Sequence, residues 1–206
     1  LISSKTFDAK KACRELAKQD PKLGKLIKKH GPFVWGKRKA LDPFEYLLRS
    51  IVFQQLHGKA AATIHGRVLK IFGKTHPTPL QILECEVELL RAAGLSGNKT
   101  LAAKDLARAA HEGKVPDRKQ LAKMSNEEII EILTEIRGIG RWTVEMLLMF
   151  GIGRADVLAV DDFALKKSAM ILHGKKKLTP KEFAKLGELW APYRSIASWY
   201  LWRALD

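Results

Sequence analysis

Cysteine is scarce in this sequence, with only Cys13 and Cys85 among 206 residues. Two cysteines form no metal-ligand pattern, and they fit a reduced intracellular protein. Long apolar runs are missing as well, because no stretch approaches the about 18 residues of a membrane helix. No signal peptide is visible. The chain begins at Leu1, which leaves open whether residues precede it, and we expect an intracellular location (cytoplasm, nucleoid or nucleus) away from membranes.

Acidic residues are also in short supply. The chain has 22 Asp and Glu against 37 Lys and Arg, which gives a formal net charge of +15. Such an excess indicates a polyanionic partner, and nucleic acid is the first candidate. A basic protein whose charge serves only solubility is the alternative interpretation of the same numbers.

Strand signals are few, and apolar residues recur at helical spacing along most of the chain. Helix starts with capping signals are expected at Asp42–Glu45, Ser125–Glu128 and Thr179–Glu182. One continuous helix is expected over 80–92. Lys99 falls in the first turn of another helix, where its charge opposes the helix dipole. We interpret it either as a phosphate contact or as a tolerated surface residue, and we predict an all-α fold.

The stretch 133–143 (LTEIRGIGRWT) predicts a helix, a tight turn and a second helix. Gly138 and Gly140 interrupt the helical spacing and allow a hairpin with positive φ. Backbone N–H groups at the start of the second helix lack intrahelical partners. They therefore form a ready site for a phosphate group.

This stretch resembles the helix-hairpin-helix motif of the base-excision DNA glycosylase superfamily. The resemblance continues in 157–167 (VLAVDDFALKK), where an acidic residue follows a strand-like VLAV. Asp162 lies 22 residues after Gly140, a spacing that suits the superfamily. Many DNA-binding proteins share a glycine hairpin, so the hairpin together with the aspartate is the more specific signal. The most similar group is the AlkA-like DNA-3-methyladenine glycosylases, which 48–73 and 193–202 also resemble.

The resemblance implies two helical lobes with a cleft between them. Residues 43–155 would form the central lobe, which contains the helix-hairpin-helix at about 129–150. Residues 1–42 together with 156–206 would form the second lobe. The chain would be a compact form that lacks the N-terminal β-domain of larger members. Its two cysteines exclude the four-cysteine iron–sulfur cluster of the endonuclease III branch.

The resemblance also implies a catalytic group and a base pocket. The pattern Asp-aromatic-apolar-apolar-basic (DFALK) assigns catalysis to Asp162 and not to the adjacent Asp161. An N-cap role for Asp162 is compatible with catalysis, because one carboxylate can do both. Trp142, Trp202 and Met146 match positions that line the base pocket, and Met146 replaces a tyrosine of the larger bacterial members. Ordinary core packing is the alternative interpretation for the two tryptophans.

Polar residues interrupt two apolar helices near Gln54, Gln55 and His57. Such groups are either buried and hydrogen-bonded or offered to a ligand. In the resembling group this junction carries the wedge that fills the gap left by a flipped nucleotide, and the matching positions are Leu56 and His57. We favour His57, for which an ordinary helix-terminal histidine is the alternative.

The hairpin has two further implied roles. The residues that would hold the DNA backbone are Gly138, Ile139, Gly140, Arg141 and Thr143. A monovalent cation, Na⁺ or K⁺, would be held by the main-chain carbonyls of Thr134, Ile136 and Ile139. No cofactor is expected to be required.

The implied function is hydrolysis of the N-glycosidic bond of alkylated purines, of the 3-methyladenine and 7-methylguanine type, in base excision repair by base flipping. Bifunctional members place a lysine nucleophile just before the threonine of the motif, and Trp142 stands there, so we expect no lyase activity. The expected partner is double-stranded DNA with damaged bases, bound by a monomer. The alternatives are a non-catalytic helix-hairpin-helix DNA-binding protein and a monofunctional glycosylase for deaminated or mismatched bases. A purely structural helical protein would leave the charge and the hairpin unexplained.

Overall fold

The structure, a computed structural model, describes residues 7–34 and 42–205. All regular structure in these ranges is helical and no strand occurs in them, so the all-α prediction is confirmed. No helix in the described part is long and apolar enough to span a membrane. The chain forms two compact units: a central unit, Leu41–Leu147, and a terminal unit, Leu1–Ala40 with Leu148–Asp206. The predicted lobes, 43–155 and 1–42 with 156–206, follow slightly different bounds, and the cleft between them stays a prediction.

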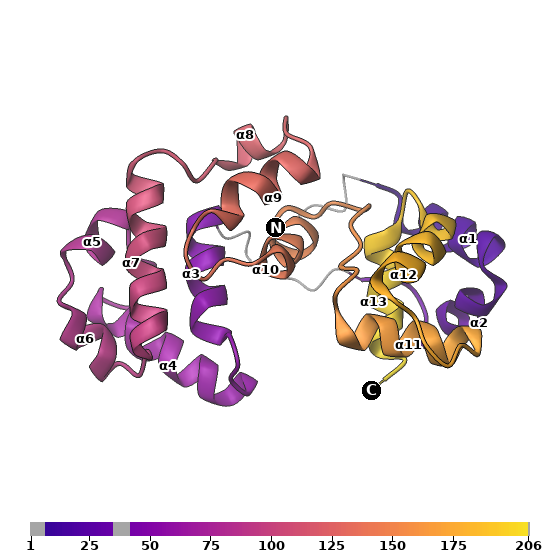
Figure 1. Ribbon diagram of the computed structural model, residues 1–206, viewed down its shortest axis with the longest axis horizontal. Helices are drawn as coiled ribbons and strands as arrows, with labels where there is room; N and C mark the ends of the chain where they lie inside the picture. Colours follow the sequence, from indigo (N-terminus) through magenta and orange to yellow (C-terminus); the bar gives the residue numbers. More distant parts are fainter. Residues whose placement is uncertain (1–6, 35–41, 206) are drawn as a thin grey trace. The chain divides into compact units, whose positions relative to one another are not determined.

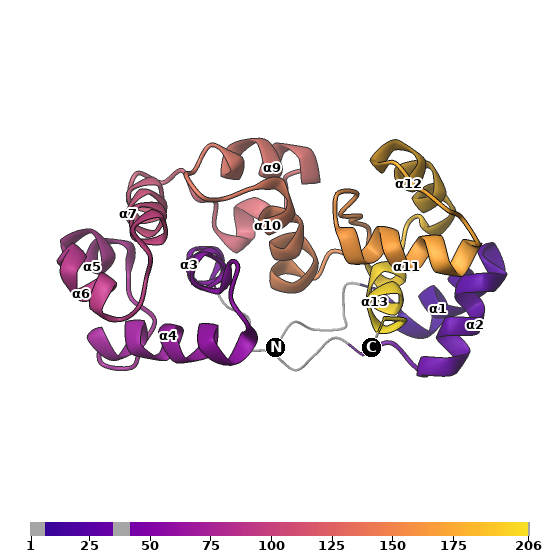
Figure 2. The same cartoon turned by 60° about the horizontal axis from the view of Figure 1, so that its bottom comes forward.

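The central unit is built around α7. Its elements are α3 (Pro43–Phe53), α4 (Gly58–Ile71), α5 (Pro79–Glu84), α6 (Val87–Ala92), α7 (Gly97–His111), α8 (Arg118–Leu121), α9 (Asn126–Thr134) and α10 (Arg141–Met146). Helix α7 packs against α3 and α5 (Figures 1 and 2). Its inward face carries Leu106, which is fully buried like Ile51 of α3 and Ile82 of α5. Burial of this apolar face fixes the three helices around one core.

The terminal unit joins the two ends of the chain. It contains α1 (Ala9–Gln19), α2 (Pro21–His30), α11 (Phe163–His173), α12 (Pro180–Gly187), the 3₁₀ turn η3 (Glu188–Trp190) and α13 (Arg194–Arg203). Figure 1 shows α1 and α2 beside α11–α13. The Tyr200 hydroxyl donates to the Gly31 carbonyl at 2.9 Å, and the Trp190 Nε1 donates to the Asp20 carboxylate at 2.9 Å. Buried polar groups thus find partners across the two ends of the chain.

The three predicted capping signals are confirmed. Asp42, Ser125 and Thr179 each accept a hydrogen bond from a backbone N–H in the first turn of α3, α9 and α12. In all three, the glutamate at the third helical position reaches back to the backbone of the capping residue. Each such cap contributes about 1 kcal/mol, so local sequence alone sets where these helices begin.

The single helix predicted over 80–92 is wrong. The structure has two short helices there, α5 and α6, separated at Cys85 and Glu86. Lys104 on α7 explains the break, because its Nζ donates to the carbonyls of Leu83 (2.8 Å) and Cys85. The terminal carbonyls of α5 therefore receive their hydrogen bonds from a side chain instead of from a continuing helix.

Candidate active site

Asp162 is the N-cap of α11. Its Oδ1 accepts the backbone N–H of Leu165 at 2.8 Å, and its own N–H donates to the carbonyl of Ala159 at 3.1 Å. Asp162 is half-buried, whereas Asp161 is exposed. The second acid of the pair is thus the one whose carboxylate caps a helix, and its assignment as the catalytic acid stays a prediction.

Trp202 of α13 approaches the Asp162 carboxylate. The indole Nε1 donates to Oδ1 at 3.4 Å, which is a long hydrogen bond. The indole also packs against Phe150, with ring centroids 5.7 Å apart and an interplanar angle of 39°. A fixed carboxylate therefore stands beside an aromatic pair within the terminal unit. Sequence reasoning missed Phe150 as a member of this group.

Phe150 belongs to the π-helical turn η2 (Leu147–Ile152), which continues α10 along the chain. Turns of this kind occur mostly as single turns within helices and often lie at functional sites. A hydrophobic period of 3.6 residues cannot indicate such a local change in helical winding.

Two residues at the start of α13, Arg194 and Ser195, fix the segment that leads to Asp162. The Arg194 guanidinium binds Asp156 through two hydrogen bonds, Nε to Oδ1 at 2.6 Å and Nη2 to Oδ2 at 2.7 Å. The Val157 N–H donates to Ser195 Oγ at 3.0 Å, and the Ser195 N–H donates to the carbonyl of Ala155 at 2.9 Å. The two hydrogen bonds between the Arg194 guanidinium and the Asp156 carboxylate restrict the orientation of both side chains.

The strand-like VLAV (157–160) is not a strand in the structure. Alternating apolar residues remain buried, since Val157 and Ala159 face the core. The hydrogen bonds of Val157 go to a serine side chain instead of a neighbouring strand. The apolar pattern therefore predicted burial correctly and secondary structure incorrectly.

The hairpin between α9 and α10 turns at Gly138. Its φ is +79°, and a Cβ on it would stand 2.7 Å from the Cβ of Ala102, so only glycine fits. Gly140 differs, because its φ is −93° and no atom lies within 4 Å of the place its Cβ would take. Positive φ is thus required at one of the two glycines. Gly140 begins α10 as an N-cap without a side-chain hydrogen bond.

The residues predicted to hold the DNA backbone fall into two groups. Gly138, Gly140 and Arg141 are exposed. Ile139 and Thr143 are buried, and their N–H groups donate to the carbonyls of Ile136 (3.0 Å) and Gly140 (2.9 Å). Ile139 and Thr143 therefore stabilise the turn through burial and backbone hydrogen bonds. Gly138, Gly140 and Arg141 are the residues of this set that a ligand can contact.

Arg141 is engaged by two carboxylates. Its guanidinium donates two hydrogen bonds to Glu127, at 2.8 and 3.0 Å, and one from Nε to Glu145 at 3.2 Å. Its hydrogen bond with Glu127 raises the pKa of Arg141. Glu145 is buried, so Arg141 also neutralises a charge inside the fold. The charge of Arg141 is therefore not fully available to a phosphate.

Trp142 and Met146, the other predicted base-pocket residues, both lie on α10 of the central unit. Trp142 is 49% exposed, which is unusual for a tryptophan, whereas Met146 is 8% exposed. The Met146 carbonyl accepts a hydrogen bond from the Tyr46 hydroxyl at 2.9 Å. Tyr46 is a polar neighbour of Met146 that sequence reasoning missed.

The predicted wedge lies in the exposed segment between α3 and α4. Leu56 and His57 are both exposed, and His57 is the N-cap of α4 without making a side-chain cap. Neither is a buried core residue, so the choice between them stays open. Lys99, interpreted from the sequence as a phosphate contact or a tolerated surface residue, instead makes hydrogen bonds within the protein. Its Nζ donates to the carbonyls of Val52 and Gln54 at the end of α3.

The carbonyls predicted to hold a monovalent cation come from one turn. Thr134 is the last residue of α9, where terminal carbonyls have no intrahelical N–H partner. The Ile136 carbonyl accepts the N–H of Ile139 at 3.0 Å and has a second lone pair. Among the described residues, no group of three or more His, Cys, Asp or Glu could hold a metal ion. Neutral oxygens of this kind fit a hard monovalent ion.

Comparison with known proteins supplies the family. Residues 48–192 match the family described as HhH-GPD superfamily base excision DNA repair protein, and this range covers most of the chain. The chain belongs to the HhH-GPD superfamily. Its hairpin and Asp162 both lie within the matched range, whereas Trp202 lies beyond it.

Named relatives of this HhH-GPD protein agree with that assignment. DNA-3-methyladenine glycosylase 1 of Schizosaccharomyces pombe is 40% identical over 184 residues, which cover 88% of this chain and 80% of the relative. Alkylbase DNA glycosidase-like protein mag2 of the same organism is 36% identical over 203 residues, covering 97% and 95%. The structure of S. pombe 3-methyladenine DNA glycosylase (Mag1) in complex with abasic DNA matches with a TM-score of 0.83 at 38% identity. That match covers 94% of this chain and 95% of the other.

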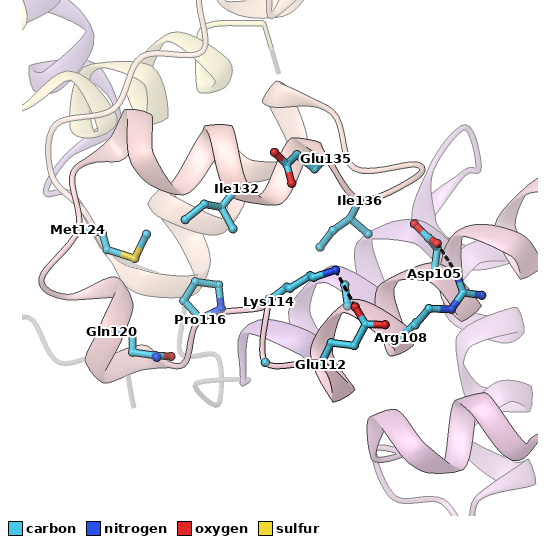
Figure 3. A pocket seen from close by; sticks show the side chains of 12 residues that line it. Asp105, Arg108, Glu112, Lys114, Pro116, Gln120, Met124, Ile132, Glu135 and Ile136 are labelled. Carbon is cyan, nitrogen blue, oxygen red and sulfur yellow. Dashed lines mark hydrogen bonds and ion pairs between the residues drawn. The ribbon is translucent and has the colours of Figure 1, made fainter.

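A pocket of about 630 Å³ lies elsewhere in this HhH-GPD protein, between the end of α7, the turn that follows it, and α9 (Figure 3). Lys114 pairs with Glu112 at 2.7 Å and Arg108 with Asp105 at 3.1 Å, and Glu135 adds a further acidic side chain to the lining. Its walls contain no aromatic ring and none of the residues predicted to bind the base. This pocket therefore lacks the aromatic faces that the predicted base pocket has.

Proposed function

We propose that the protein is a monofunctional DNA glycosylase that hydrolyses the N-glycosidic bond of alkylated purines in base excision repair. The observation that carries this proposal is the carboxylate of Asp162, fixed as the N-cap of α11 and approached by the indole of Trp202. The family and the relatives named DNA-3-methyladenine glycosylase support the same reaction.

Asp162 would act on the sugar. Cleavage of the N-glycosidic bond develops positive charge at C1′ in an oxocarbenium-like transition state. A carboxylate held in place stabilises this charge without having to reorganise, and it can orient or deprotonate the attacking water. The backbone N–H of Leu165 donates to Oδ1 at 2.8 Å, and this hydrogen bond fixes the orientation of the carboxylate.

The aromatic residues would act on the base. An alkylated purine of the 3-methyladenine or 7-methylguanine type is cationic and leaves without strong general-acid help. Aromatic faces attract such a cation. Trp202 packed on Phe150, together with the exposed Trp142, would supply these faces. Met146 would contribute an adaptable, polarizable wall, and its presence bears on which lesions are accepted.

The reaction would stop at an abasic site. Arg141, Trp142 and Thr143 begin the second helix of the hairpin, and none of them offers an amine that can form a Schiff base. Asp162 would therefore direct water to C1′. The strand stays intact after the base has left.

Double-stranded DNA with damaged bases is the proposed partner, bound by a monomer inside the cell. The exposed turn at Gly138, Gly140 and Arg141 would meet the backbone, since N–H groups at a helix start favour phosphate. Leu56 or His57 would fill the gap left by the flipped nucleotide, whose extrusion costs a few kcal/mol. The carbonyls of the turn at Thr134, Ile136 and Ile139 would hold Na⁺ or K⁺, which would supply positive charge beside the same phosphate.

A lesion panel tests the proposal. Purified protein is incubated with duplexes that each carry one site of 3-methyladenine, 7-methylguanine, hypoxanthine or a mismatched base. Release of the free base is measured, and strand integrity is examined before and after alkali. We expect release of the alkylated purines, strand breaks only after alkali, and no covalent adduct trapped by borohydride.

Three other outcomes would change the assignment. Preferential release of hypoxanthine or a mismatched base would assign the protein to a deaminated-base or mismatch activity. DNA binding without release of any base would identify a non-catalytic binding module. A trapped adduct would mean that a lysine reaches the sugar, which contradicts the monofunctional assignment.

A further inference from the structure

The segment between α3 and α4 has little support of its own. Gln55, Leu56 and His57 are exposed, and Gln55 has a φ of +54°. Residues with a Cβ are rarely found in this left-handed conformation, because Cβ crowds the following carbonyl oxygen. The Leu56 N–H donates to the Phe53 carbonyl at a long 3.4 Å, and the His57 carbonyl accepts the N–H of Ala61 at 3.0 Å only where α4 begins. Something outside the segment must hold it in this shape.

Two side chains supply that support from outside the segment's backbone. Lys99, on α7, donates from Nζ to the carbonyls of Val52 at 2.8 Å and Gln54 at 2.7 Å. Gln54 in turn donates from Nε2 to the carbonyl of Gly138 at 2.8 Å. One ammonium group thus binds the end of α3, and one amide joins that end to the turn of the hairpin.

We propose that Lys99 and Gln54 are positioning residues that hold the wedge segment ready for insertion and couple it to the hairpin. The inference rests on the proposed function, because it assigns a role within base flipping. A wedge that is already ordered avoids the entropy loss of ordering it during insertion. A grip on the DNA backbone at the hairpin would also fix the segment through the carbonyl of Gly138, the one residue of the hairpin turn that requires glycine.

The geometry of Lys99 argues against a direct DNA contact. Its ammonium group is directed at two backbone carbonyls at short distances, and burial lowers the pKa of the amine. A lysine offered to a phosphate would extend into solvent, where its charge is fully hydrated. The same helix provides a comparison, because Lys104 makes the same kind of cap at the end of α5.

Lys104 offers a matched control. Lys99→Met and Lys104→Met remove the same charge from the same helix, and each frees two terminal carbonyls of another helix. The carbonyls freed by Lys104→Met precede Glu86, at the junction of two short helices to which the proposed function gives no role. Equal losses of thermal stability are therefore expected from the two variants, and any difference in base flipping isolates the wedge segment.

The experiment compares single-turnover excision of 7-methylguanine from two duplexes, one fully paired and one with an abasic site opposite the lesion. Flipping is easier when the lesion has no pairing partner. We expect Lys99→Met to lower excision from the paired duplex by about tenfold or more relative to Lys104→Met, since small misplacements carry large kinetic penalties. On the unpaired lesion this difference should largely disappear. Gln54→Met should show the same pattern with a smaller loss.

Hydrogen exchange gives a readout that does not depend on activity. Amides of 52–58 should exchange faster in Lys99→Met than in wild type, and they should be unchanged in Lys104→Met. Unchanged exchange in Lys99→Met would overturn the inference, and so would an equal loss of excision on both duplexes. Should wild type excise no base while Lys99→Met still loosens 52–58, the proposed function would fail and the structural coupling would stand.

Discussion

Helices α11 and α10 begin in opposite ways. The start of α11 is filled by the carboxylate of Asp162, which accepts the N–H of Leu165 at 2.8 Å. The start of α10 has Gly140, which brings no side chain to the first turn. A helix start attracts negative charge in both cases. The protein supplies its own anion to α11, where the proposed chemistry needs a fixed carboxylate, and leaves the start of α10 open to an anion from outside.

The largest effect should come from removing the anion at α11. Asp162→Asn keeps an N-cap of nearly equal strength, so stability should be almost unchanged. Loss of the carboxylate should lower the single-turnover excision rate by about 10²–10³-fold, a typical loss for a fixed electrostatic group. Affinity for undamaged duplex should change little. Asp161→Asn is the control; an inactive Asp161→Asn beside an active Asp162→Asn would move the catalytic carboxylate one residue earlier.

Substitutions at the two glycines of the hairpin should have different effects, one on stability and the other on DNA affinity. Gly138→Ala should destabilise the protein by about 2–4 kcal/mol, from left-handed strain and the clash with Ala102. Gly140→Ala meets no atom within 4 Å and should leave the melting temperature near wild type. Its methyl group would stand where the phosphate is proposed, so DNA affinity should fall. Equal affinity for duplex DNA in wild type and Gly140→Ala, measured by titration, would remove the phosphate from this helix start.

The indole N–H of Trp202 should have a moderate effect. Trp202→Phe keeps an aromatic ring against Phe150 and removes the donor 3.4 Å from Asp162. A single hydrogen bond of this kind corresponds to a loss of about two- to tenfold in excision rate. Trp199→Phe, on the same helix and packed against Phe33, is the control. Single-turnover rates that are equal in the two variants would show that the N–H does not act on the carboxylate.

The smallest effect should come from removing the charge of Glu127, which pairs with Arg141 of the hairpin. Glu127→Gln leaves Arg141 paired only with Glu145 and makes more of its charge available to DNA. Exposed ion pairs are weak, so affinity for undamaged duplex should rise by only about two- to threefold. The slope of log affinity against log salt should steepen by at most about one. Glu131→Gln on the same helix removes an equal charge without touching Arg141, and it should leave both quantities unchanged.

Local chemistry made the helix starts predictable. Four-residue patterns identify Asp42, Ser125 and Thr179 as caps, and an N-cap was the alternative interpretation for Asp162. Lys99 and Lys104 show where such reasoning stops. Each donates to two carbonyls that lie 19–47 residues away along the chain, and sequence periodicity does not indicate such distant contacts. The break between α5 and α6, the pairing of Arg141 and the contact of Phe150 with Trp202 depend on tertiary packing in the same way.

The hydrogen bond from Tyr200 to Gly31 has a consequence for synthesis on the ribosome. It joins residues 169 positions apart, so the terminal unit cannot close until α13 has emerged. The central unit needs only Leu41–Leu147, and domains emerging first generally fold first. A growing chain would therefore possess its hairpin well before Trp202 reaches the Asp162 carboxylate. The hairpin that is proposed to bind DNA would therefore form before the proposed catalytic group, which is completed only when α13 has folded.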